Sequence, residues 1–357
     1  MRKRRIIIIS DLHIGAGRTK EGSINYREDF VYDSDFYDFL KYWTKDSVGY
    51  ETELVLNGDI VDIIKSVYRD GKVYKKDTID FLEKSIEAHK VFFSALRDFE
   101  YEGGKITYII GNHDQAMASS ELQNILCEKT GIGIRFIKRE YFTDGIWIEH
   151  GNKYEAINRT DTETVWVKDE RGNEILNMPW GSRFVVEVID KISFKKPYLD
   201  RWRPLEKSIK WGLIFETRIT LYSIYRTVLF ILKNRKFYDP IMRRNFKVPL
   251  RFVMDAMGHK VVNRSAMVIL RRPEIKTVIM GHTHKAMVIK QKDKTYINTG
   301  TWIPYVSLDT PQIGLIEKKT FCLVERTQNN SFSGLFVWFG MGKIFEEVKE
   351  YMTVVPD

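Results

Sequence analysis

The sequence of 357 residues contains only two cysteines, Cys127 and Cys322. Two thiols cannot form the disulfide framework of a small secreted domain, and we expect them to be reduced in a cytoplasmic protein. No stretch approaches the ~20 uncharged residues that a membrane-spanning helix requires. The apolar run at 6–9 follows basic residues, as in a signal peptide, but it is too short for one and predicts a buried strand instead.

Apolar and charged residues are abundant. Hydrophobic residues make up 43% of the chain and aromatic residues 13%, which is enough to bury the core of one large domain or two ordinary ones. The net charge of +9 is uneven: residues 1–150 contain 22 Lys and Arg against 26 Asp and Glu, whereas residues 151–275 contain 25 against 14. The middle of the chain is therefore the part that we expect to meet an anionic partner.

The first 150 residues alternate between two hydrophobic periods. Short β-branched runs predict buried strands at 4–10, 52–57, 105–110 and 146–150. Amphipathic patterns between them predict helices at 33–45, 77–99 and 118–130. Strands that alternate with helices are typical of a layered α/β fold.

The character of the chain changes at residue 152. The segment 152–272 is basic, rich in Trp, Arg and Tyr, and interrupted by prolines, and strand-like runs return only after 273. We therefore predict a core formed by residues 1–151 and 273–357, with 152–272 as a basic, largely helical insertion, or cap. Within the cap, 209–232 has 15 apolar residues of 24 and no clean polar face, which predicts a helix that is buried or lies against lipid or a partner.

Five short motifs follow predicted strands, at the strand ends where layered α/β folds bind ligands. They are SDLHIG, NGDIVD, GNHDQ, EHGN and GHTH, in this order along the chain. They contain five of the chain's seven histidines, together with carboxylate and amide side chains. The potential metal ligands in these motifs are Asp11, His13, Asp59, Asn112, His150, His282 and His284.

The chemistry of this set points to divalent metal ions. Imidazoles, carboxylates and an amide oxygen suit borderline to hard cations, so we expect Mn²⁺, with Zn²⁺ and Fe²⁺ as alternatives. Seven ligands are too many for one ion but make two sites if one carboxylate bridges them. In an extended turn His282 and His284 would point the same way, so that one imidazole could serve each ion.

The motif order DxH, GDxxD, GNHD, HG, GHTH resembles that of the calcineurin-like metallophosphoesterase superfamily. The resemblance covers residues 6–151 and 275–302 but not the cap. It implies a four-layer α/β/β/α sandwich with a site for two metal ions at the strand ends. It also implies hydrolysis of a phosphoester or pyrophosphate bond by a hydroxide that bridges the two ions.

The resemblance also implies a role for each motif residue. It assigns Asp11, His13 and His284 to the first ion and Asn112, His150 and His282 to the second. It assigns Asp59 to a bridge between the two ions. It places His113 beside the substrate phosphate, where it could stabilise charge or protonate the leaving oxygen, with Asp114 as its orienting partner. Asp62 could orient a ligand or be an ordinary carboxylate at a helix start.

Other polar residues outside this set are less informative. We interpret His89, inside the predicted helix 77–99, as structural. His259, Arg183, Arg243 and Arg244 lie in the cap and could contact a substrate, the arginines by gripping a phosphate. Ordinary structural or solvated side chains are the simpler interpretation of all four.

Three functions fit this pattern. The first is a hydrolase of a small-molecule or lipid-linked phosphate, since the insertion before GHTH is similar to the cap of the UDP-2,3-diacylglucosamine pyrophosphohydrolases. That branch of the superfamily, however, has arginine at the position of His113, and its insertion is much shorter. The second is a DNA or RNA nuclease, because a basic cap would suit a phosphate backbone, although the apolar stretch 209–232 suits lipid better. The third is a non-catalytic scaffold, which should have lost metal ligands, and here none is missing.

The cap itself has three interpretations. Residues 190–272 contain 20 Lys and Arg against 6 Asp and Glu around the apolar run, which is the composition of a segment that makes peripheral contact with a membrane. Alternatively, the run packs within the cap or a dimer interface and the charges are solvated. Binding of nucleic acid is the third interpretation.

Overall fold

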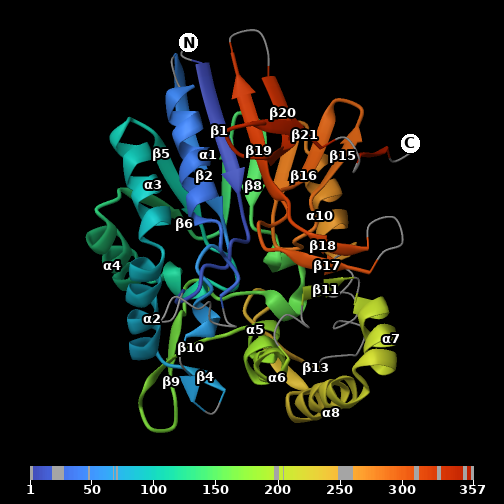
Figure 1. Cartoon of the computed structure of the whole chain (residues 1–357). Coiled ribbons are helices and arrows are strands. Elements are labelled where there is room, and N and C mark those ends of the chain that lie inside the picture. Colours follow the sequence, from blue (N-terminus) through green and yellow to red (C-terminus); the bar gives the residue numbers. More distant parts are fainter. Residues whose placement is uncertain are drawn as a thin grey trace.

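The computed structural model describes residues 3–17, 28–46, 49–66, 68–69, 71–196, 201–203, 205–247, 260–308, 313–327, 331–348 and 352–354. Two β-sheets face each other across the centre of the molecule, and helices lie outside them (Figure 1). His259 lies outside the described residues.

The first sheet has seven strands in the order β21-β20-β19-β1-β2-β5-β6. Four of these strands are parallel, namely β1 (Lys3–Ile9), β2 (Tyr50–Asn57), β5 (Lys105–Ile109) and β6 (Ile134–Ile137). The others extend the sheet by antiparallel pairing: β19 (Lys319–Arg326), β20 (Ser331–Trp338) and β21 (Phe345–Glu347).

The second sheet has six strands in the order β22-β15-β16-β14-β8-β7. At its centre β14 (Thr277–Met280) pairs in parallel with both β8 (Ile146–Glu149) and β16 (Lys294–Asn298). The remaining strands are β7 (Glu140–Thr143), β15 (Met287–Gln291) and β22 (Met352–Val354).

Helices cover the outer face of each sheet. On the first sheet these are α1 (Asp33–Lys45), α2 (Lys75–Ala88), α3 (Lys90–Tyr101) and α4 (Ser120–Thr130). On the second sheet it is α10 (Lys260–Leu270). The predicted four-layer α/β/β/α sandwich is confirmed.

The isoleucines of β1 show how the sequence builds these layers. Successive side chains of a strand point to opposite faces of the sheet. Ile7 and Ile9 belong to the hydrophobic cluster between the first sheet and its helices, whereas Ile6 and Ile8 belong to the cluster between the two sheets. The strand is apolar without alternation because both of its faces are covered.

The predicted helix 77–99 is two helices, and His89 is the residue between them. The His89 ring is buried, with Nδ1 at 2.8 Å from Asp33 Oδ1 and Nε2 at 3.1 Å from Glu28 Oε2. Glu28 in turn accepts hydrogen bonds from the amides of Gly15 and Gly17, in the segment that follows β1. His89 is therefore structural, and its partners explain the break in the helix.

We expect His89 to make stability depend on pH. Burial disfavours the imidazolium, but the hydrogen bonds to Asp33 and Glu28 more than offset it and raise the pKa of His89 from 6.5 to about 9. Because the folded pKa is the higher one, this stabilisation is complete below pH 6.5 and is lost as pH rises through 9. Thermal unfolding should show a fall in Tm between these pH values that is smaller in His89→Gln; an equal fall in both proteins would contradict the assignment.

The segment between β8 and α10 forms a cap at the end of the molecule opposite the chain termini (Figure 1). Its helices are α5 (Trp180–Phe184), which continues through a π-helical turn at Val185–Ile189 into α6 (Asp190–Lys195), then α7 (Leu205–Phe215) and α8 (Thr217–Lys233). Its strands are β9 (Trp166–Lys168), β10 (Glu174–Leu176), β11 (Trp202–Arg203), β12 (Lys236–Asp239) and β13 (Arg244–Lys247).

Two features of the segment 152–272 differ from those predicted. The helix α10 lies inside the range 152–272, yet its Val262 and Ala266 pack with Val278 of β14, so it is part of the core. Only hydrophobic periodicity could have identified this helix, and periodicity alone does not say which sheet a helix packs against. The apolar run 209–232 is two helices rather than one, with the break at Glu216.

Candidate metal centre

All five motifs lie at the same ends of β1, β2, β5, β8 and β14, where the two sheets meet the cap (Figure 1). The backbone there is unusual. Among the described residues only eight non-glycine residues have positive φ, and five of them are Asp11, His13, Asp59, His282 and His284. Such conformations are strained and concentrate at functional sites. Five predicted ligands therefore adopt a backbone conformation that residues other than glycine rarely adopt.

The first cluster contains Asp11, His13 and His284. His13 Nε2 lies 3.1 Å from His284 Nε2, and His284 Nε2 lies 3.3 Å from Asp11 Oδ1. The ligand atoms of the three residues lie within 4.8 Å of one another. Two imidazole nitrogens that face each other beside a carboxylate have the spacing of ligands around one cation.

The second cluster contains Asp59, His150 and His282, whose ligand atoms also lie within 4.8 Å of one another. His150 donates its Nδ1 proton to the Asn57 carbonyl at 2.9 Å, so Nε2 is the ring nitrogen that faces Asp59. Both His150 Nε2 and Asn112 Oδ1 are buried without a hydrogen-bond partner. A buried polar atom with no hydrogen-bond partner is costly, so both atoms fit a bound cation.

Asp59 lies between the two clusters. Its Oδ2 is 3.2 Å from His150 Nε2 and 3.8 Å from His13 Nε2, so the same oxygen faces a ligand of each cluster. Its Oδ1 accepts a hydrogen bond from the His113 amide at 2.8 Å. This is the position that the predicted bridging carboxylate requires.

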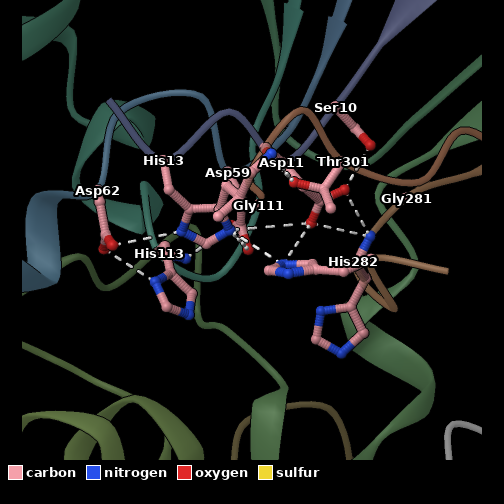
Figure 2. Close-up of polar contacts among 12 residues, drawn as sticks. Ser10, Asp11, His13, Asp59, Asp62, Gly111, His113, Gly281, His282 and Thr301 are labelled. Atoms are coloured by element: carbon pink, nitrogen blue, oxygen red, sulfur yellow. Dashed lines mark hydrogen bonds and ion pairs between the residues drawn. The ribbon is translucent and has the colours of Figure 1, made fainter. Parts of the chain in front are cut away.

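His282 and His284 do not share an extended turn, as the sequence suggested. Both residues have left-handed backbone conformations, and their rings belong to different clusters. The backbone amide of His282 donates to both oxygens of Asp11, at 3.1 and 2.9 Å, which ties the GHTH motif to the end of β1 (Figure 2). The two imidazoles therefore lie one in each cluster, by a different geometry from the extended turn that was expected.

The electrostatic balance of the site favours positive charge. Burial opposes ionisation of Asp59, but the neighbouring His150 and His113 hold the pKa of that carboxyl well below its usual range. Burial likewise disfavours the His150 imidazolium, yet Asp59 and Asp11 raise its pKa to about 10. The carboxylates therefore create a negative electrostatic potential at this buried site. Bound metal cations could neutralise it in place of protons.

His113 is held by Asp62, not by Asp114. Asp62 Oδ1 lies 2.8 Å from His113 Nδ1, and Asp62 Oδ2 lies 3.3 Å from His13 Nδ1 (Figure 2). Asp114 instead accepts hydrogen bonds from the Tyr108 hydroxyl and from the amides of Ile60 and Gly111, the latter at 2.6 Å. The expected pairing of Asp114 with His113 is corrected, because the backbone turn directs the Asp114 side chain inward, under the motif.

One contact of the site had no signal in the sequence. Glu155 follows the EHGN motif by a short turn, and its Oε2 lies 2.9 Å from His282 Nε2. Asn158 approaches the same nitrogen at 3.4 Å. Neither residue belongs to a recognisable motif, so only the tertiary structure brings them to this candidate ligand, where they restrain the orientation of its ring.

A search against protein-family models matches residues 4–286 to the calcineurin-like phosphoesterases. The chain belongs to this family. The match spans the cap as well as the motifs, and the two clusters described above are candidate sites for the two divalent metals that the family typically binds.

Solved structures give more distant similarities. A dimetal phosphatase from Danio rerio is 11% identical with a TM-score of 0.36, over 93% of this chain and 99% of that one. Vacuolar protein sorting 29 from Cryptosporidium parvum is 13% identical with a TM-score of 0.34, over 98% of this chain and 99% of that one. These similarities are too distant to inform function. No curated protein matched the sequence.

The three cap arginines singled out in the sequence lie in different settings. Arg183 donates to Asn234 Oδ1 at 2.7 Å and lies 3.6 Å from Glu187, so it holds parts of the cap together. Arg243 and Arg244 are exposed around the β12–β13 turn. None of the contacts described for these arginines joins them to the two clusters.

The variants Asp62→Asn and Asp114→Asn should show that these two carboxylates have different roles. Loss of the charge beside His113 and His13 is expected to lower activity by about 10–100-fold, the usual effect of removing a group that orients a metal ligand. Asp114→Asn should instead lower Tm, since an amide group there would face the donors of Tyr108, Ile60 and Gly111. Steady-state kinetics and thermal unfolding of both variants test this; the reverse pattern would restore Asp114 as the orienting residue.

Proposed function

We propose that this calcineurin-like phosphoesterase is a hydrolase that uses two divalent metal ions to cleave a phosphoester or pyrophosphate bond. The single observation that carries the proposal is the pair of donor clusters on either side of Asp59, which together hold two carboxylates and four imidazoles. A non-catalytic scaffold on this fold has no need to keep every ligand, and therefore fits the site less well.

The bound ions would supply Lewis acidity, which activates a water molecule and neutralises charge on the phosphoryl oxygens. The chain's own residues place a proton donor beside them. His113 is held through Nδ1 by Asp62 at 2.8 Å, which leaves Nε2 as the ring atom that can donate to the leaving oxygen. Its side chain is 17% exposed, in contrast to the buried Asp59 and Asp62, so it is the group of the three that a substrate can reach.

The substrate that we favour is a small or lipid-linked phosphate. The cap supports this choice because α5 packs directly on the GNHD motif: Ser182 donates to the Asn112 carbonyl at 3.4 Å. A cap this close to the ligands would limit the space in front of them, whereas a nuclease needs an open path for a polymer. A nuclease stays the second candidate because of the positive charge of the cap.

The test is a panel of substrates with the Mn²⁺-loaded protein, and with Zn²⁺ and Fe²⁺ in parallel. The panel contains a phosphomonoester, a phosphodiester, a nucleotide pyrophosphate and both single- and double-stranded DNA. We expect metal-dependent release of product from one of the first three. Turnover of DNA alone would favour the nuclease, and inactivity with every substrate and metal would favour a scaffold.

A further inference from the structure

The cap exposes a large apolar surface on α7 and α8. Eleven large apolar side chains of these two helices are between 38% and 71% exposed. They are Ile209, Trp211, Leu213, Ile214 and Phe215 of α7, and Leu221, Ile224, Tyr225, Val228, Leu229 and Leu232 of α8. We call these eleven side chains the apolar face. A water-exposed cluster of this size marks an interaction surface.

The orientation of α8 is set by what it packs against. Phe230 is buried against Trp180 and Phe184 of α5, with ring centroids 4.9 and 5.4 Å apart. The six exposed residues of α8 recur at spacings of three and four, so they form one stripe on the side away from Phe230. The helix α8 is therefore apolar on two sides. One side is buried within the cap, and the other faces outward.

The segment that carries the apolar face is strongly positive. Residues 201–247 contain 12 Lys and Arg against 3 Asp and Glu, a net charge of +9. Beside the stripe lies a cavity of about 670 Å³, whose lining includes Lys191, Arg226 and Lys233. Leu229 belongs to both the stripe and the cavity, so the two are continuous. One carboxylate, that of Glu187, also lines the cavity.

We infer that the apolar face docks onto a bilayer that contains anionic phospholipids. Apolar side chains would enter the boundary between headgroups and acyl chains, while the surrounding Lys and Arg attract the headgroups. The cavity beside Leu229, with three cations, has the charge to receive a headgroup phosphate. Among the described residues, no helix is long and apolar enough to cross a membrane.

Charge distinguishes this occupant from a second copy of the chain. Two copies joined through the apolar face would bring two segments of net charge +9 together, and this repulsion opposes association. An anionic bilayer has the complementary charge. The inference does not rest on the proposed hydrolase activity, since binding to vesicles is measured without substrate or turnover.

The test is co-sedimentation of the full chain with vesicles. We expect binding to vesicles of phosphatidylcholine with phosphatidylglycerol, little binding to phosphatidylcholine alone, and a decrease with added salt. The triple variant Leu221→Gln, Val228→Gln, Leu232→Gln should lower the partition coefficient by about tenfold or more, because these side chains can no longer enter the acyl boundary. Glutamine is a good helix former, so α8 should persist.

A matched control removes exposed apolar side chains from other helices. Val91→Gln, Tyr101→Gln and Val268→Gln lie on α3 and α10, are at least 45% exposed, and should leave vesicle binding unchanged. Three results would overturn the inference. These are absence of binding to anionic vesicles, concentration-dependent dimers that the α8 triple variant abolishes, and salt-dependent DNA binding without vesicle binding.

Discussion

Replacing Asp59 by asparagine is expected to lower kcat/KM by ~10³-fold or more and to reduce metal content at both sites. One oxygen of Asp59 faces His150 Nε2 at 3.2 Å and His13 Nε2 at 3.8 Å, so both clusters depend on the same negative charge. Asparagine keeps an oxygen that can accept the His113 amide hydrogen bond, and we therefore expect the motif to stay folded. Elemental analysis of the purified protein, together with kinetics on the best substrate of the panel, measures both effects.

The control for this variant is Asp293→Asn. Asp293 is an exposed carboxylate paired with Lys276, in the turn between β15 and β16, and its loss should change neither metal content nor rate. If Asp59→Asn retained two full equivalents of metal, Asp59 would not be the bridge between the clusters. The circular dichroism spectrum and Tm of Asp59→Asn should match those of the unaltered protein. A match would show that the loss of metal is not a consequence of unfolding.

Replacing His113 by glutamine is expected to have a different signature. Activity should fall by ~10²–10⁴-fold, the usual cost of a lost acid–base group, while the metal content stays unchanged. Glutamine can still hydrogen-bond Asp62 but cannot transfer a proton near neutral pH. The loss should appear in kcat more than in KM.

The metal content of this variant also decides an ambiguity in the geometry. The ring of His113 lies close enough to His13 and Asp59 for those three residues to hold an ion together. The family resemblance places His113 beside the substrate instead. If His113→Gln lost activity and metal in parallel, His113 would be a metal ligand, and its assignment beside the substrate would be wrong. The variant for comparison is Asp62→Asn, which keeps the rings of both His113 and His13.

The candidate metal ligands could be identified from the sequence because their signals are local. Each ligand directly follows a strand, and the strands could be recognised from short β-branched runs. The parallel strands of one sheet end at one edge, so Asp11, Asp59 and Asn112 had to lie together once the layered fold was assumed. The four-layer arrangement itself came from the resemblance, since periodicity alone does not say how two sheets stack.

Contacts between residues far apart in the sequence could not be predicted in the same way. Whether Asp62 or Asp114 holds His113 depends on side-chain directions inside tight turns, where the backbone of Asp59 is left-handed. Adjacency in sequence favoured Asp114, but three donors from β5 and the β2 turn hold its carboxylate away from the ring. The contact of Glu155 with His282 joins residues 127 positions apart.

The sequence by itself determined the strand-end ligands, the alternation of strands and helices, and the basic, apolar composition of the cap. The tertiary structure alone decided where that composition is displayed. A helix that is apolar most of the way round carries no internal signal for its buried side, because either side gains by leaving water. In α8, the packing of Phe230 against Trp180 decides which side is buried. The stripe that includes Leu221 and Leu232 then faces outward.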